Sequence, residues 1–346
     1  MEAGMVKQSE TGELLTILKR CLPDAHGIDM TGFQPVPGGG NNRLYCVEAS
    51  CGPVVLKRYF RHPGDPRDRF ESEYGFSTFL WEHGIRNIPE PLARDDETGT
   101  ALYRFVEGRA YSHSEIHDQT VCDAQKFLNQ INEWRSDPGA VILPDASESC
   151  FTIQQHLDVI EKRVQHLFDL PRTEGIRGEA ASFVRHELQP AWTSVRQECI
   201  RHVESSGLSL QEPVNTGDRI LSPSDFGFHN ALQTVDGPVF LDFEYAGWDD
   251  SAKTVCDFFC QIAVPVPIRY WEEVSRVCAE LTSSPERTLL RMRLLLPVYR
   301  IKWVCITLNH FLAVEGERRR FATGGGEMLL TTQLGLAERL LSSIQF

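Results

Sequence analysis

Short apolar runs that alternate in part with polar positions mark the first hundred residues of the chain. Between 33 and 60 this pattern, broken by two glycine-containing turns, predicts three strands. Apolar positions at helical spacing then predict a helix from about 68 to 83. Further short strands are expected near 91–93 and over 101–106, so this part of the chain predicts an antiparallel sheet with one main helix.

From about residue 112 onward, apolar positions recur mostly every three or four residues, which is typical of helices. The helical segments expected here include 121–134, 152–168 and 176–203. Three short strands that bracket two loops are expected at 219–222, 231–234 and 238–243. The sequence therefore predicts an α+β fold, with a β-rich lobe over 1–108 and a larger, mainly α-helical lobe over 109–346.

The chain is long enough to bury a large core, since 41% of its 346 residues are hydrophobic. Acidic residues outnumber basic ones by 48 to 35, and a net charge of −13 repels the phosphates of nucleic acids and of anionic membranes. The longest apolar stretches, such as 289–298, contain arginine and are too short to span a bilayer. We therefore expect neutral or cationic partners, and neither nucleic acid nor membrane.

Ten cysteines are scattered along the chain without any Cys-x-x-Cys pair. Cys256 and Cys260 lie one helical turn apart in an apolar run, a position that favours packing over metal binding. With no signal peptide recognisable, the thiols are expected to be reduced, and the protein to be cytoplasmic and without structural zinc.

The clearest chemical pattern lies in the two loops between the short strands of the second lobe. Asp225 is followed five residues later by Asn230, and Asp242 stands at the end of a hydrophobic strand twelve residues further on. Phosphoryl transfer needs a carboxylate beside the attacking hydroxyl and oxygen ligands for magnesium ions that bridge the nucleotide phosphates. These three residues supply such a set.

The two loops resemble the catalytic and metal loops of the aminoglycoside phosphotransferase and choline kinase-like family, whose members are relatives of the protein kinases. The resemblance extends over roughly 33–259 and implies a two-lobed protein-kinase-like fold that uses ATP and Mg²⁺. It implies that Asp225 is the catalytic aspartate and that Asn230 and Asp242 are the magnesium ligands. It also likens Asp257, which follows at the start of a helix, to a structural aspartate that would tie down the catalytic loop or cap backbone donors.

The catalytic loop departs from the family pattern, which usually reads His-Gly-Asp. Pro223 and Ser224 stand where the family has histidine and glycine. Because that histidine mainly supports the loop, we interpret the change as a subfamily variant rather than a loss of activity. His229, beside Asn230, has two interpretations, a phosphate contact or a hydrogen bond that stabilises the loop.

A kinase also needs a flexible backbone over the phosphates, a lysine that binds them and an acid that orients this lysine. Lys57, on the third predicted strand, and Glu73, in the helix that follows, resemble the lysine and the acid of the family. Glu71 is the alternative partner, on another face of the helix. The candidate phosphate-covering turn lies between the first two strands and contains Gly39, Gly40, Asn41 and Asn42.

The strand that ends before Glu107 and Gly108 resembles the hinge between the lobes of the family. On this resemblance, backbone groups of Arg104, Phe105 and Val106 would hydrogen-bond adenine. The Walker motif is absent, which excludes the other large class of nucleotide-binding enzymes.

The leading hypothesis is an ATP-dependent kinase that phosphorylates a hydroxyl group of a small molecule, of aminoglycoside, amino alcohol or sugar type. An acidic cleft of Glu244, Asp249 and Asp250, with Trp248 or Trp303 as a cation–π surface, would suit an amine, and a neutral sugar would suit it nearly as well. Asp249 and Asp250 also read as helix N-caps, and Trp248 as a packing residue. The alternative function is a nucleotide-binding pseudokinase or regulatory protein without turnover.

Overall fold

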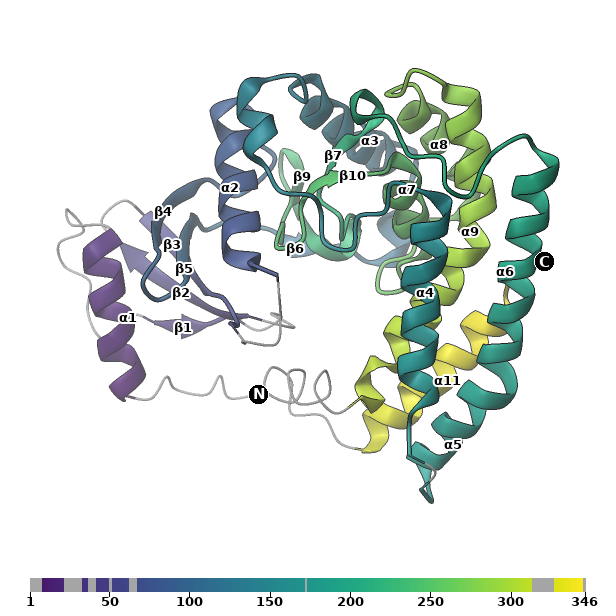
Figure 1. The fold of residues 1–346 in the computed structure, drawn as a ribbon. Coiled ribbons are helices and arrows are strands. Elements are labelled where there is room, and N and C mark those ends of the chain that lie inside the picture. The colour runs from purple at the N-terminus through teal and green to yellow at the C-terminus, as the bar shows by residue number, and fades with distance from the viewer. Residues whose placement is uncertain are drawn as a thin grey trace.

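A computed structural model provides the structure of the chain. It describes residues 8–21, 33–36, 42–49, 52–61, 67–171, 173–312 and 327–344, with the side chains of 8–10 and 327 excepted. Figure 1 shows the antiparallel sheet of the N-terminal part on one side and the helices of the C-terminal part on the other. The predicted α+β architecture is therefore confirmed.

The N-terminal lobe is a five-stranded antiparallel sheet with the order β1-β2-β3-β5-β4. Its strands are β1 (Gln34–Pro35), β2 (Arg43–Ala49), β3 (Gly52–Arg58), β4 (Pro91–Asp95) and β5 (Thr100–Arg104). Two helices accompany the sheet, α1 (Gln8–Cys21) and α2 (Arg69–Glu82). The strands expected between 33 and 60 and the helix expected at 68–83 are all present.

The alternation along β5 explains why this sheet has a helix against each face. Leu102 packs with Leu14 and Ile17 of α1, whereas Ala101 and Tyr103 pack with Phe70 of α2. Successive side chains of a strand point to opposite faces, so a strand with a helix on each side is apolar at consecutive positions. α2 is thereby fixed against the strands β3 and β5.

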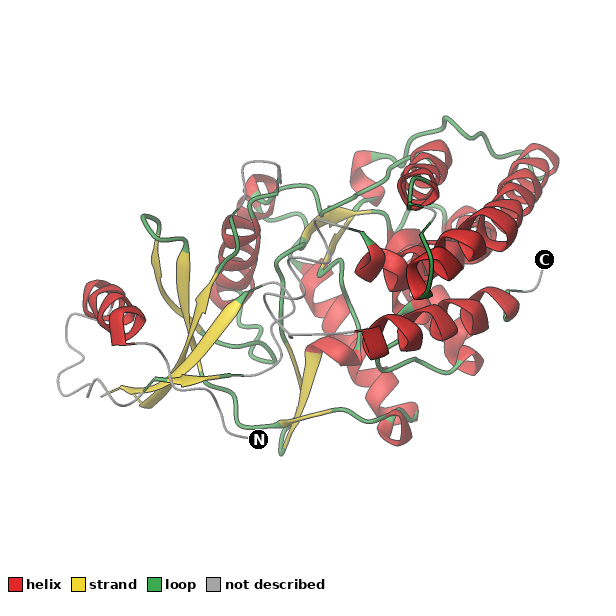
Figure 2. Cartoon of the chain, turned by 90° about the horizontal axis from the view of Figure 1, so that it is seen from below, coloured by secondary structure: helices red, strands yellow, loops and turns green. Residues whose placement is uncertain are grey.

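The C-terminal lobe is built around one long helix, α9 (Pro285–Leu308), which packs against α4, α6, α7, α8 and α11. The other helices of this lobe are α3 (Asp118–Glu133), α4 (Ile153–Phe168), α5 (Ile176–Phe183), α6 (Gln189–Ser205), α7 (Ser251–Cys260), α8 (Trp271–Ala279) and α11 (Glu327–Ser342). Figure 2 shows these helices as one bundle beside the strands. A π-helical turn at 184–188 joins α5 to α6, so the single helix expected over 176–203 is nearly continuous.

Two small sheets lie between α2 and the helices of the C-terminal lobe and carry the two predicted site loops (Figure 1). One contains β6 (Arg109–Ala110), β8 (Ala231–Thr234) and β9 (Gly237–Phe240), and the other contains β7 (Ile220–Ser222) and β10 (Gly247–Asp249). Gly108 approaches this region so closely that a Cβ atom would lie 2.9 Å from the carbonyl oxygen of Gln233. The division into 1–108 and 109–346 remains our proposal, and the pairing of β6 with β8 supports it.

Aromatic packing anchors these loops to the helical lobe. Phe226 and Phe243, each next to a predicted site aspartate, pack around Phe127 of α3 together with Phe240, and Phe226 also stacks on Phe258. The rings of Phe127 and Phe240 stack with their centroids 4.4 Å apart. Buried aromatic pairs add to the free energy of burial, so the backbone beside both aspartates is held against the core.

The helices and the cysteines bear on two of the expectations from the sequence. Within the described ranges, no helix is long and apolar enough to cross a membrane. Cys256 and Cys260 are buried in α7, and burial raises the pKa of both thiols. Both side chains act as packing residues.

Candidate active site

Lys57 lies at the junction of the two lobes and contacts one acid from each. Its Nζ is 2.7 Å from Oε2 of Glu73 on α2 and 2.5 Å from Oδ1 of Asp242 in the loop after β9. Lys57 and Glu73 are buried, and the Asp242 side chain is 40% exposed. The alternative acid, Glu71, is exposed and pairs with Arg94, so the structure brings Lys57 to Glu73 as the leading interpretation expects.

Negative charge dominates around this lysine. Burial acts to lower the pKa of Lys57, but Asp242 and Glu73 outweigh it and raise this pKa well above its usual value. Burial, opposed by Lys57, raises the pKa of Glu73 to about 7. Burial also raises the pKa of Asp242, an effect that Lys57 opposes and Glu244 reinforces. One cation thus faces several acids, an arrangement that further positive charge would stabilise.

Asp225 is held in a hydrogen-bonded loop. Its Oδ1 is 3.1 Å from Nε2 of His229, and its backbone carbonyl accepts a hydrogen bond of 2.9 Å from Nδ2 of Asn230. Burial acts to raise the pKa of Asp225, but the bond with His229 outweighs it and this pKa is lowered. His229 therefore contacts the loop carboxylate, in agreement with the second of its two interpretations.

The loop takes a conformation that non-glycine residues seldom adopt. In the described part of the chain, Glu148, Ser224 and Asp242 are the non-glycine residues with positive φ, at 54°, 66° and 63°. Such residues cost free energy, persist only when their surroundings fix them, and cluster at functional sites. Ser224 directly precedes the predicted catalytic Asp225, and Asp242 is itself a predicted magnesium ligand.

Side chains of α7 hold the strained loop in place. Lys253 Nζ donates to Ser224 Oγ at 2.9 Å and to Asp249 Oδ2 at 2.5 Å. Ser222 Oγ accepts from the Ser224 amide at 3.0 Å and from Thr254 Oγ1 at 2.8 Å. This network supports the loop in a chain that has proline at the position of the family histidine. The residues in α7 were missed by sequence reasoning, because a lysine and a threonine in a helix have no distinctive spacing.

The prediction of an acidic cleft is wrong, because its three acids are buried and already paired with other side chains. Asp249 pairs with Lys253, and Asp250 caps α7 through the Ala252 amide while it also contacts His156 and Arg291. The N-cap interpretation of Asp250 is therefore confirmed.

Glu244 and Trp248 likewise serve the structure. Glu244 accepts a hydrogen bond of 2.6 Å from Nδ2 of Asn42 and lies 3.8 Å from Nε of Arg69. The Trp248 indole donates to the carbonyl of Ala140 at 3.0 Å, as expected of a packing residue.

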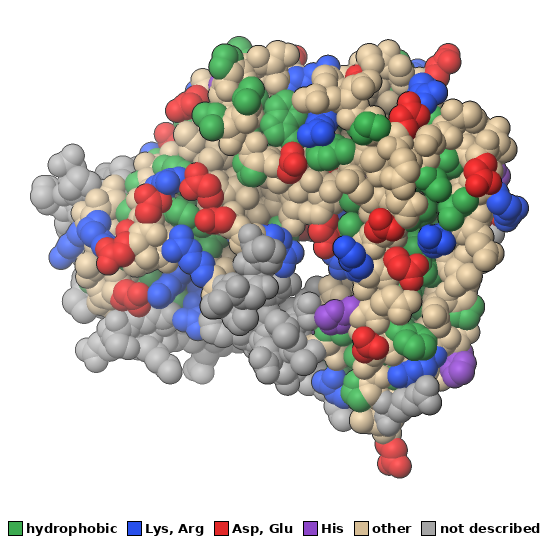
Figure 3. All heavy atoms as spheres, in the orientation of Figure 1, with side chains coloured by type: hydrophobic (Ala, Val, Ile, Leu, Met, Phe, Trp, Pro, Cys, Tyr) green, Lys and Arg blue, Asp and Glu red, His purple; other side chains and the backbone are tan. Residues whose placement is uncertain are grey.

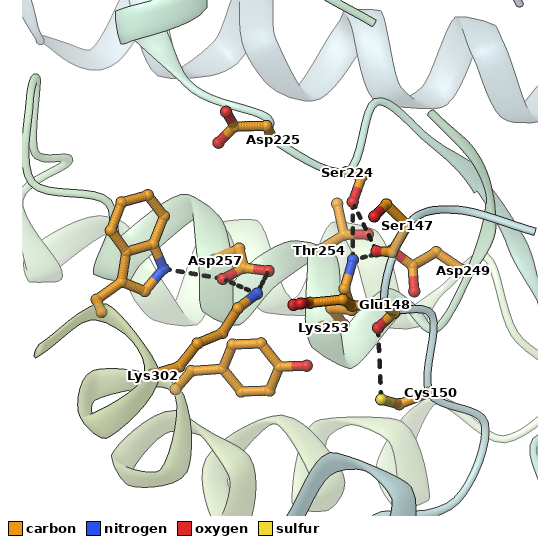
Figure 4. Close-up of polar contacts among 12 residues, drawn as sticks. Ser147, Glu148, Cys150, Ser224, Asp225, Asp249, Lys253, Thr254, Asp257 and Lys302 are labelled. Carbon is orange, nitrogen blue, oxygen red and sulfur yellow. Dashed lines mark hydrogen bonds and ion pairs between the residues drawn. The ribbon is translucent and has the colours of Figure 1, made fainter. Parts of the chain in front are cut away.

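Asp257 has a different partner from the one that the family resemblance implied. Its carboxylate accepts from Lys302 Nζ at 2.8 and 3.0 Å and from the Trp303 indole at 2.8 Å. Figure 4 shows this ion pair on the opposite side of the site from Lys253, with Asp225 above both. Asp257 thus links α7 to α9 instead of contacting the catalytic loop directly.

The predicted nucleotide-binding segments are described only in part. Gly39, Gly40 and Asn41 lie outside the described residues. Asn42 is buried, and besides its bond to Glu244 it accepts a hydrogen bond from the Phe60 amide at 3.2 Å. Its side chain therefore joins the lobes.

The hinge has fewer available donors than we expected. The amide of Arg104 donates to Glu90 and that of Phe105 donates to Pro53, at 2.9 and 3.1 Å. Because these two N–H groups already have backbone partners, adenine would have to bond to N–H groups from Val106 onward or to carbonyl groups before it.

Asn230 and Asp242 have a donor set that fits magnesium. Nδ2 of Asn230 points to the carbonyl of Asp225, which leaves its amide oxygen as a ligand. Lys57 contacts Oδ1 of Asp242, so Oδ2 can act as a second oxygen ligand. Mg²⁺ prefers such hard oxygen ligands and takes the rest of its shell from phosphates and water. The local excess of acids would favour it further.

The comparisons with known proteins agree with this geometry. The model of the phosphotransferase enzyme family matches residues 32–275, well over half of the chain. The chain belongs to this family, and the predicted class of enzyme, a phosphotransferase, is confirmed. No curated protein sequence matches the chain.

Several solved structures share the whole fold. An AMP-bound spectinomycin phosphotransferase is 12% identical over 97% of this chain and 99% of its own, with a TM-score of 0.61. Choline kinase from Cryptosporidium parvum Iowa II is 13% identical over 96% of both chains, with a TM-score of 0.55. An amicoumacin kinase bound to AMP-PNP and Ca²⁺ is 12% identical over 97% of this chain and 93% of its own, also with a TM-score of 0.55. The predicted two-lobed, protein-kinase-like fold is thereby confirmed.

Proposed function

We propose that this protein transfers the γ-phosphate of ATP to a hydroxyl group of a small molecule. The observation that carries the proposal is the convergence of Lys57, Glu73 and Asp242 from three separate elements, beside the loop that holds Asp225. The solved structures with ADP and with AMP-PNP, named as a spectinomycin phosphotransferase and an amicoumacin kinase, support ATP as the donor.

Each residue has a distinct part in the proposed reaction. Asp225, whose pKa is lowered, stays ionised and accepts a hydrogen bond from the acceptor hydroxyl, which it orients toward the phosphate. Lys57 binds the phosphates, and Glu73 holds its ammonium in place. Asn230 and Asp242 hold magnesium, which when bound neutralises the charge of the phosphate oxygens. The hinge backbone near Val106 binds adenine.

The proposal is tested by magnesium-dependent release of ADP from ATP with a panel of amino alcohols, aminoglycosides, sugars and nucleosides. One class should stimulate release, and Asp225→Asn should abolish this stimulation while ATP still binds. Asp242→Ala should also weaken magnesium-dependent nucleotide binding. Asp158→Asn, at an exposed position of α4, is the matched control and should behave like wild type.

Two outcomes would contradict the proposal. Full turnover in Asp225→Asn would refute the assignment of the catalytic aspartate. Nucleotide binding without any acceptor-dependent turnover would favour the alternative function, a pseudokinase that binds nucleotide for regulation.

A further inference from the structure

Three ion pairs lie in the helical lobe on the same side of Asp225. They are Asp257 with Lys302, Glu148 with Arg163, and Asp249 with Lys253. The charge of Lys302 acts on Asp225 and on Glu148, and that of Lys253 also acts on Glu148. Figure 4 shows Asp225 on one side and Asp257, Lys302, Lys253 and Glu148 on the other. If Asp225 orients the acceptor hydroxyl, as the proposed function requires, an exposed pair among these three is within the part of the lobe that the rest of the acceptor would meet.

Glu148 is the most accessible acid of the three pairs. Its side chain is 34% exposed, whereas those of Asp257 and Asp249 are 5% and 0% exposed. Yet both oxygens of Glu148 accept hydrogen bonds from Nη2 of Arg163, at 2.5 and 2.7 Å. The acid that an incoming amine could reach is therefore already compensated.

The position of Glu148 is linked to the catalytic loop. It is one of the three non-glycine residues with positive φ among the described residues, together with Ser224 and Asp242. The preceding residue, Ser147, accepts a hydrogen bond of 3.5 Å from Ser224 Oγ and donates its amide to the carbonyl of Tyr245 at 3.0 Å. The Glu148–Arg163 pair is thus held at a fixed place relative to Asp225, as a residue that positions substrate would be.

The pairing of the acids decides which acceptor fits. An ammonium group loses its hydration on entering the site, and a carboxylate that is already paired with a cation compensates this loss less well than an unpaired one. Here each of the three acids has a cation of its own. Hydroxyl groups lose less on entry and both donate to carboxylates and accept from Arg, so the partly exposed Glu148–Arg163 pair suits them. The other two pairs are too buried to contact an acceptor.

We infer that the acceptor is an uncharged, polyhydroxylated compound of the sugar type, and that the Glu148–Arg163 pair determines its preference over amine-bearing acceptors. This inference rests on the proposed function and specifies its substrate class. It also replaces the acidic cleft that the sequence suggested, since the acids of that cleft are buried against other partners.

The test compares acceptors that differ by an amine, such as glucose with glucosamine and ethylene glycol with ethanolamine. The quantity measured is the ratio of kcat/KM for the neutral compound to that for the amine. For wild type we expect a ratio above about 10, equal to about 1.4 kcal/mol. Arg163→Met exposes the charge of Glu148 and should lower this ratio at least about tenfold. Arg163→Lys, which keeps the charge, should change it much less.

Arg287→Met is the matched control, because Arg287 forms a similar two-oxygen contact with Glu212 at an exposed position. It should leave the ratio unchanged. A wild-type preference for amines would overturn the inference, and so would an unchanged ratio in a folded Arg163→Met variant. The wild-type comparison decides the question even if Arg163→Met does not fold. Failure of the proposed function looks different, because then no acceptor of either kind stimulates release of ADP.

Discussion

The Lys253–Asp249 pair should stabilise both the helical lobe and the catalytic loop. The two side chains are 1% and 0% exposed, and Lys253 also donates to Ser224 beside Asp225. Removal of one partner from a buried ion pair typically costs about 3–5 kcal/mol, because the other charge stays buried without compensation. We therefore expect Lys253→Met to lower the free energy of unfolding by about 3–5 kcal/mol. For a chain of this size the melting temperature should fall by about 6–10 °C, at roughly 2 °C per kcal/mol.

The size of this effect should depend on pH in a defined direction. Burial, opposed by Lys253, raises the pKa of Asp249 to about 6. At pH 8 Asp249 is ionised and the loss of Lys253 leaves a buried charge. At pH 5 the folded protein already holds a proton on Asp249, so the same substitution should cost less. Urea unfolding of wild type and Lys253→Met at both pH values measures the difference.

A double-mutant cycle tests whether the pair acts as a unit. Asp249→Asn keeps the oxygen that accepts from the Asp250 amide but leaves Lys253 without its acid. The double variant should be more stable than the sum of the single effects predicts, by at least about 2 kcal/mol. The same cycle on the exposed pair Arg287–Glu212 should give a coupling of about 0–1 kcal/mol. Additive effects of Lys253→Met and Asp249→Asn would refute the reasoning.

The kcat of Lys253→Met should also fall, because Ser224 loses the donor that holds its strained conformation.

Three further predictions concern other parts of the molecule. Glu73→Gln should reduce kcat/KM by at least about tenfold, because the lysine beside it loses its orienting acid, whereas Glu71→Gln should have little effect in the same ADP-release assay. Burial, opposed by an aspartate, lowers the pKa of His156, so as the pH falls through about 6.5 the unfolded chain takes up this proton before the native protein does, and the native protein loses stability. His156 should contribute up to about 1.4 kcal/mol per pH unit to the pH dependence of the free energy of unfolding, and this contribution should disappear in His156→Gln when unfolding is followed in urea. Gly247→Ala should destabilise by about 1–3 kcal/mol, since a Cβ atom there would lie 2.2 Å from a carbonyl oxygen, whereas Gly217→Ala, with nothing within 4 Å, should be neutral in thermal melts.

Much of the fold could be predicted from the chain itself. The strands of the first lobe and the helices of the second follow from hydrophobic periodicity, because each element buries one face or stripe. The strand expected over 238–243 ends at Phe240, since Asp242 takes a left-handed conformation that ends the pairing. Hydrophobicity alone contains no signal for such a turn. The strand at 247–249 was missed because two of its three residues, a glycine and an aspartate, are disfavoured in strands.

Site residues could be predicted where their order along the chain matches that of the family. They could not be predicted where their role depends on which side chains are buried beside them. Lys57 and Glu73 meet as their order in the sequence suggested. Asp249 and Glu244, in contrast, looked like surface acids. Lys253 follows Asp249 at a spacing of four residues, which does not show that the pair is buried, and nothing in the sequence places Asn42 beside Glu244. Partners of buried charges come from segments up to 202 residues apart, which only the tertiary structure can bring together.

The bonds that Lys57 and Asn42 form with the second lobe also bear on synthesis of the protein. Lys57 can form its ion pair only after Asp242 has been synthesised, 185 residues later, and Asn42 can bond to Glu244 only after that residue has been synthesised. At about 5–20 residues per second, a ribosome needs roughly 10–40 s to cover that distance. During this interval the nascent first lobe has a lysine with only Glu73 beside it and an asparagine without its final acceptor. The first lobe therefore reaches its final structure only late in translation, when the loop after β9 has left the ribosome.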